Sequence, residues 1–120
     1  MREGKKQVAC KIVNLEFGRP TVEAAMQRLS QELRLAQANR IHTLKIIHGY
    51  GSTGQGGAIR KATHLMLKQR RMRGQIKCYI PGEEFSAFHN AGRMAVQTDP
   101  RLRQDSDFGR QNDGITIVLL

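Results

Sequence analysis

The sequence predicts a single α/β domain in the form of a two-layer sandwich, in which a four-stranded mixed sheet packs against two main helices. Short apolar runs rich in β-branched residues alternate with longer segments in which apolar residues recur every three or four positions. The chain has 120 residues, of which 39% are hydrophobic, enough for one compact core and too few for two domains. Strands that alternate with helices join through right-handed crossovers, so we expect the first three strands to be parallel.

The first strand and the first helix follow a basic tail at residues 1–6, and the domain itself is expected over residues 7–120. The strand is expected over residues 8–15, where the nearly continuous apolar character is typical of a strand covered on both faces. Thr21 is a good N-cap for the helix, which is expected to end near Asn39. The core-facing stripe of this helix comprises Val22, Ala25, Met26, Leu29, Leu33 and Ala36.

The rest of the sheet is expected from three further apolar segments. The second strand, the second helix, the third strand and the last strand are expected at residues 43–47, 57–72, 76–80 and 114–120. Gly74 is expected to stop the second helix. The last strand is so apolar that it should lie within the sheet. Between the third and last strands, residues 81–113 are expected to form an inserted helix and loop segment.

A glycine-rich stretch after the second strand is the strongest functional signal. Its glycines are Gly49, Gly51, Gly54, Gly56 and Gly57. Glycine lets a ligand approach the main chain closely, and the unpaired N–H groups of a helix start attract anions. A strand, a glycine loop and a helix start in this order predict a phosphate site, with His48 facing the loop and Arg60 near the first helical turn. The alternative is that the loop is only a tight connection.

The charge of the chain points to a polyanionic partner. Twenty Lys and Arg residues outnumber ten Asp and Glu residues, giving a formal charge of +10, which favours nucleic acid or an acidic membrane surface. Aromatic residues make up only 5% of the chain and Trp is absent, so phosphate contacts should dominate over base stacking. Arg60, His64, Lys68 and Arg71 follow one side of the second helix. Stabilisation of the helix C-terminus by cations is the structural alternative.

Other classes of site receive less support. Cys10 and Cys78 lie in apolar runs and are expected to be buried free thiols, with no metal site. No leader or membrane helix is visible, so we expect a cytoplasmic protein without membrane contact, monomeric by default. A nucleotide-binding module is a further alternative, because Gly49, Gly51 and Gly54 fit a Gly-x-Gly-x-x-Gly pattern after a strand. The acidic residue that this class needs at the end of the next strand is missing.

Three motifs follow one another along the chain: Thr-Val-Glu-Ala-Ala from Thr21, His-Gly-Tyr-Gly from His48 and Gly-Ala-Ile-Arg from Gly57. Together they resemble the Smr domain, the small MutS-related domain. The resemblance spans about residues 8–80 and, more loosely, the last strand. It implies a compact α/β fold similar to the C-terminal domain of a bacterial translation initiation factor. It also implies binding of DNA or RNA and, for several members, endonucleolytic cleavage.

The first strand departs from the family pattern Leu-Asp-x-His-Gly, whose Asp and His are implicated in cleavage. Asn14 replaces the Asp and Glu16 replaces the His, and an amide cannot act as a base. We therefore expect nucleic-acid binding with weak or absent endonuclease activity. The alternative is an active DNA or RNA endonuclease in which His48 is the general acid or base and works with Glu16. The carboxylates that would assist, hold Mg²⁺ or Mn²⁺, or simply stabilise turns are Asp105, Asp107 and Asp113.

The expected binding residues gather where ligands of open parallel sheets bind, beyond the carboxyl ends of the strands. They are Asn14, His48, Gly49, Tyr50, Gly51, Ser52, Gly54, Gly56, Gly57, Arg60, His64, Lys68 and Arg71. Nucleic-acid binding by these residues is expected to need no cofactor, and a divalent metal ion would matter only to cleavage.

Overall fold

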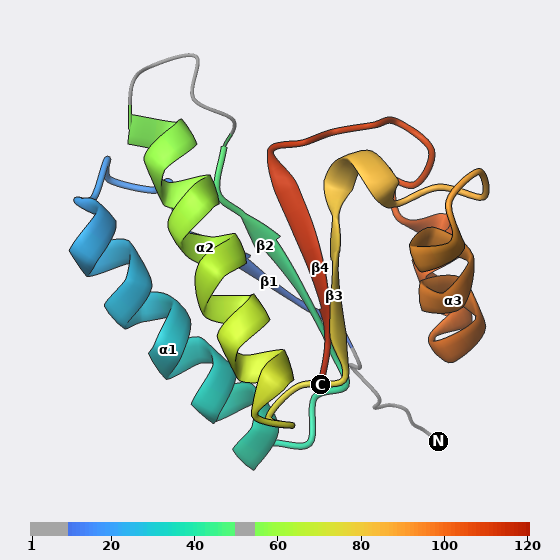
Figure 1. Ribbon diagram of the computed structural model, residues 1–120, viewed down its shortest axis with the longest axis horizontal. Coiled ribbons are helices and arrows are strands. Elements are labelled where there is room, and N and C mark those ends of the chain that lie inside the picture. The colour runs from blue at the N-terminus through green and yellow to red at the C-terminus, as the bar shows by residue number, and fades with distance from the viewer. Residues whose placement is uncertain (1–9, 50–54) are drawn as a thin grey trace, which may run out of the picture.

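A computed structural model describes residues 10–49 and 55–120 of the chain (Figure 1). The elements in chain order are β1 (Cys10–Asn14), α1 (Val22–Ala38), β2 (Thr43–Ile47), α2 (Gln55–Met72), β3 (Cys78–Pro81), the 3-10 helix η2 (Gly82–Glu84), α3 (Asn90–Thr98), the 3-10 helix η3 (Pro100–Gln104) and β4 (Ile115–Leu119). A single α/β domain with one four-stranded mixed sheet is thereby confirmed.

The sheet has the strand order β1-β2-β4-β3, so β3, which was expected to be parallel to β1 and β2, is separated from them by the last strand. β1 and β2 pair in parallel, but β4 lies between β2 and β3 and is antiparallel to both. The first three strands share the expected direction, yet within residues 10–49 and 55–120 the only parallel pair is β1 with β2. All five residues of β4 are buried, so this strand is suited to a central position, and its expected place within the sheet is confirmed.

The expected cover of β1 on both faces is wrong. β1 lies at an edge of the sheet, and Ile12 in its centre is 61% exposed. Val13, which points to the opposite face, is 2% exposed. An apolar run in the sequence does not reveal whether both faces of a strand are covered, because cover depends on segments far away in the chain.

Helices lie on both faces of the sheet, which corrects the expected two-layer sandwich (Figure 1). α1 and α2 cover one face, where Leu29, Leu33 and Leu67 belong to the same buried cluster as Leu44 and Ile46 of β2. The inserted segment covers the other face as a third layer. Its buried residues Phe85, Ala95, Val96 and Leu102 cluster with Cys78, Ile80, Ile115, Ile117 and Leu119 of β3 and β4.

Local signals set both ends of α1 and the C-terminal end of α2 as the sequence predicts, whereas α2 begins at Gln55, two residues before the expected start. The Thr21 side chain accepts a hydrogen bond from the Ala24 N–H at 3.1 Å, which caps α1. Asn39 is the C-cap of α1. α2 ends at Met72, and Gly74 follows with a φ of +73°, a conformation that favours glycine.

A buried ionic cluster anchors the third layer to the sheet. The Lys45 Nζ, on the central strand β2, lies 2.8 Å from Asp105 Oδ1 and 2.6 Å from Asp107 Oδ2. Burial alone would lower the pKa of Lys45, but the bonds to the two carboxylates raise it overall. Asp105 also accepts a hydrogen bond from the Asp107 N–H at 2.8 Å, as a turn-stabilising carboxylate does.

Candidate functional site

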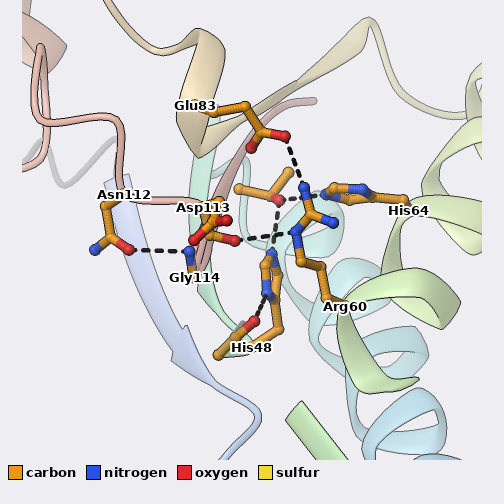
Figure 2. Close-up of polar contacts among 9 residues, drawn as sticks. His48, Arg60, His64, Glu83, Asn112, Asp113 and Gly114 are labelled. Carbon is orange, nitrogen blue, oxygen red and sulfur yellow. Dashed lines mark hydrogen bonds and ion pairs between the residues drawn. The ribbon is translucent and has the colours of Figure 1, made fainter. Parts of the chain in front are cut away.

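The candidate site lies where the carboxyl ends of β2 and β3 meet the start of β4 and one side of α2 (Figure 2). Because β4 is antiparallel to its neighbours, its first residues reach the same edge of the sheet as the last residues of β2 and β3. This edge is the one that the sequence predicts for ligand binding.

His48 is the buried centre of the site and has no exposed surface. Its Nδ1 lies 2.7 Å from the Gly49 carbonyl oxygen, and its Nε2 lies 2.8 Å from Thr116 Oγ1. A carbonyl oxygen can only accept, so we assign the ring proton to Nδ1. The Nε2 of His48 then accepts from the Thr116 hydroxyl. Both nitrogens are therefore engaged within the protein.

Thr116 extends this arrangement to a second histidine. The Nε2 of His64 lies 2.9 Å from the same Oγ1, and the two imidazole rings meet edge to face with centroids 5.6 Å apart. Because the Thr116 hydroxyl donates to His48, the His64 Nε2–H donates to Thr116. One hydroxyl thus links the end of β2, the start of β4 and the middle of α2.

The environment keeps both histidines neutral near pH 7. Burial lowers the pKa of His48 most strongly, and the charge of Arg60 lowers it further. Burial and then Arg60 lower the pKa of His64 as well. A neutral imidazole at each position matches the hydrogen-bond directions, in which each ring donates through one nitrogen.

Arg60 projects from α2 toward the turn before β4 and toward η2 (Figure 2). Its Nε donates to the Asp113 carbonyl oxygen at 3.1 Å, and its terminal nitrogen donates to Glu83 Oε2 at 2.6 Å. The side chains are 27% exposed for Arg60 and 41% exposed for Glu83. The other carboxylate oxygen of Glu83 is buried and has no hydrogen-bond partner within the described residues.

The turn at residues 112–114 holds the site against the sheet. The Asn112 side-chain oxygen accepts from the Gly114 N–H at 2.9 Å, and the Gly114 carbonyl accepts from the N–H groups of His48 and Gly49, both at 3.0 Å. The Asn112 amide donates to Asp107, which links the turn to the buried Lys45. A chain of hydrogen bonds and an ion pair therefore connects the third layer to the site.

Gly49 meets two requirements at once. Its φ is +77°, and a Cβ atom at this position would lie 2.1 Å from Glu16 Oε2. Glu16 therefore rests against the backbone just after His48, while the ring nitrogens of His48 bind Gly49 and Thr116. Asn14 and Glu16 are both exposed at the end of β1, where the Asn14 side chain accepts from the Glu16 N–H at 2.8 Å.

The structure brings only part of the expected set together. His48, Gly49, Arg60 and His64 meet at one edge of the sheet, whereas Lys68 and Arg71 are exposed farther along α2. Gly56 and Gly57 belong to α2. Four expected residues lie outside the described part of the chain: Tyr50, Gly51, Ser52 and Gly54.

Sequence reasoning missed two residues of this site. Thr116 lies in the last strand, where the sequence shows only an apolar run with one hydroxyl. Glu83 follows the third strand and gives no signal of its partner, because the pairing with Arg60 depends on the strand order. The one available clue is that Glu83 directly follows a strand whose carboxyl end lies at the ligand-binding edge.

Within residues 10–49 and 55–120, no cluster of three or more His, Cys, Asp or Glu side chains is placed to hold a metal ion. None of the helices in those ranges is both long and apolar enough to cross a membrane.

Comparison with known proteins identifies a family and a fold. The family model of the Smr domain matches residues 17–96. The crystal structure of the Smr domain of Thermus thermophilus MutS2 is similar with a TM-score of 0.57 and 24% sequence identity, covering 92% of this chain and 96% of that chain. At that identity the likeness is evidence for the fold. No curated protein matches the chain.

Proposed function

This chain belongs to the Smr domain family, and from that premise we propose that it binds nucleic acid, DNA or RNA, through the phosphate backbone. The observation that carries the proposal is the position of Arg60, a partly exposed guanidinium in the first turns of α2 at the carboxyl edge of the sheet. A guanidinium presents a planar fork that matches phosphate oxygens. The first N–H groups of α2 have no partner within the helix and lie at the positive end of the helix dipole, which favours an anion.

The remainder of α2 supports a longer footprint. Lys68 and Arg71 are exposed, and they lie on the same side of the helix as Arg60 because spacings of three and four return to one face. From Arg60 to Arg71 the helix rises by about 16 Å, at roughly 1.5 Å per residue. Over that length of the duplex axis, one DNA strand carries about five phosphates. We propose that these side chains hold neighbouring phosphates.

We further propose that cleavage is weak or absent. A general acid or base must reach the reacting group, whereas His48 is fully buried and both of its nitrogens are engaged. His48 then acts as a positioning residue that holds the Gly49 backbone. The second candidate, an endonuclease that uses His48 with Glu16, is favoured by the position of Glu16 against Gly49. That activity would depend on Mg²⁺ or Mn²⁺, because Glu16 offers oxygen ligands.

The test of both proposals is incubation with labelled single-stranded RNA, duplex DNA and branched DNA, with and without Mg²⁺ or Mn²⁺. We expect binding that weakens steeply as salt rises and little or no cleavage. Affinity that is unchanged between low and high salt would contradict phosphate binding. Robust turnover that is lost in both Glu16→Gln and His48→Ala would establish the endonuclease instead.

The Arg60→Ala variant tests the named residue. A charge-assisted hydrogen bond is worth roughly 1.5–3 kcal/mol, so we expect affinity to fall by about tenfold or more while the domain stays folded. The matched control is Arg103→Ala, which removes the same charge from an exposed position on η3 in the third layer. Equal losses from the two variants would show that only net charge matters.

A further inference from the structure

The guanidinium proposed to bind phosphate already has an anionic partner within the chain. Glu83 Oε2 accepts from a terminal nitrogen of Arg60 at 2.6 Å. Glu83 belongs to η2, which follows β3, whereas Arg60 belongs to α2, so the pair joins two elements across the site (Figure 2). The Asp113 carbonyl takes the Nε–H of the same side chain, which fixes the direction of the guanidinium.

A carboxylate and a phosphate compete for the same donors, because each offers two oxygens to the planar fork of an arginine. The resident pair is not fully satisfied. Glu83 Oε1 is buried and, among the described residues, has no hydrogen-bond partner, so the carboxylate gives up hydration without full compensation. The Glu83 side chain as a whole remains 41% exposed, which leaves it a route away from Arg60.

We propose that Glu83 is an autoinhibitory competitor, which holds Arg60 in the free protein and is displaced from it by a backbone phosphate of the nucleic acid. The inference rests on the proposed function of Arg60. A ligand gains the guanidinium only by exchanging with a carboxylate of the same chain, whose effective concentration at Arg60 is high. A polyanion that also reaches Lys68 and Arg71 has additional charge contacts with which to drive the exchange.

The adjacent residue Glu84 makes a sharp test available. Glu83→Gln and Glu84→Gln each remove one negative charge, and both positions are half-buried in the same turn, but it is Glu83 that bonds to Arg60. Affinity for a labelled single-stranded RNA would be measured for both variants at fixed salt. We expect Glu83→Gln to bind about two- to fivefold more tightly, the range for a partly exposed ion pair, and Glu84→Gln to show at most a small part of that gain.

A double-mutant cycle with Arg60→Ala locates the effect. In the Arg60→Ala background, Glu83→Gln should give no gain in affinity, because the guanidinium for which Glu83 and the phosphate compete is absent. Urea unfolding of every variant would verify that each is folded at the assay temperature.

Several results would overturn the inference. An equal gain from Glu84→Gln would assign the effect to net charge, and a loss of affinity in Glu83→Gln would make Glu83 a support for Arg60. A gain that persists in the Arg60→Ala background would place it elsewhere. If the wild type binds the RNA and Arg60→Ala binds it with the same affinity, the inference is overturned while nucleic-acid binding itself stands. Absence of binding by the wild type would overturn the proposed function itself, and the inference with it.

Discussion

A single hydroxyl on the last strand determines how two histidines are arranged. Thr116 Oγ1 lies within 2.8 Å of His48 Nε2 and within 2.9 Å of His64 Nε2, and Thr116 is fully buried. A side chain of the same shape without the hydroxyl would leave no space for a water molecule at this buried position. The ring nitrogens that face Thr116 would then lose their hydrogen-bond partner. At the scale of the residue, the site therefore depends on one oxygen atom.

We expect Thr116→Val to lower the free energy of unfolding by about 1–3 kcal/mol, because a methyl group of similar shape cannot satisfy the two imidazoles. Urea unfolding measures the change. The matched control is Thr63→Val in α2, since Thr63 is also fully buried but its hydroxyl has no hydrogen-bond partner within the described residues. That control should be neutral or stabilising, and equal losses from both variants would refute the role of the Thr116 hydroxyl.

For the elements, one lysine adds a buried ionic contact to the apolar packing of the inserted segment on the sheet. The inserted segment reaches β2 through Asp105 and Asp107, whose side chains are only 16% and 21% exposed. Burial alone would raise the pKa of Asp107, but hydrogen bonds from Lys45 and Asn112 lower it overall. The same segment carries the turn that binds His48 and Gly49, so loosening the layer should also loosen the site.

We expect Lys45→Met to destabilise the fold by about 3–5 kcal/mol, because it leaves two carboxylates facing each other without their cation. The comparison variant is Lys11→Met, which breaks a single ion pair with Glu32; the side chains are 39% exposed for Lys11 and 18% exposed for Glu32. Because this lysine reaches solvent and its loss leaves one carboxylate and not two, Lys11→Met should cost less than Lys45→Met. If both variants unfold at the same urea concentration, the buried cluster does not anchor the insertion.

At the scale of the whole molecule, the buried histidines make stability depend on pH. Burial lowers the pKa of His48 and His64 below the ordinary value of 6.5, so the unfolded chain binds more protons than the folded chain just below pH 6.5. The stability that the two neutral histidines contribute is therefore present above pH 6.5, and it is lost as the pH falls below that value. Asp99 and Asp107, whose pKa values lie below 3.8, contribute stability that is lost only at more acidic pH.

We expect the free energy of unfolding to decline between pH 6.5 and about pH 5, by up to about 1.4 kcal/mol per pH unit for His48. His64 should add less, because it is partly exposed and solvent screens its environment. Urea unfolding at several pH values checks the slope, and His64→Gln should flatten it. A stability that stays constant over this range would contradict neutral buried histidines.

Local sequence patterns specify the helices of this domain and the position of its glycine loop. Apolar periodicity, the Thr21 cap and the glycine stop at Gly74 place the long helices, because helical periodicity and capping act over a few residues. The order of strand, glycine loop and helix likewise predicts His48 and Arg60 as neighbours of one edge. The basic side of α2 also follows from residue spacing alone.

The tertiary structure decides the partners of those residues. Insertion of β4 between β2 and β3 places Thr116 between two histidines, and the carboxyl end of β3 brings Glu83 to Arg60. The inserted segment covers the second face of the sheet, and Lys45 is buried there beside Asp105. The sequence of a strand specifies its two faces but not its neighbours, because the choice of neighbours depends on contacts between segments tens of residues apart.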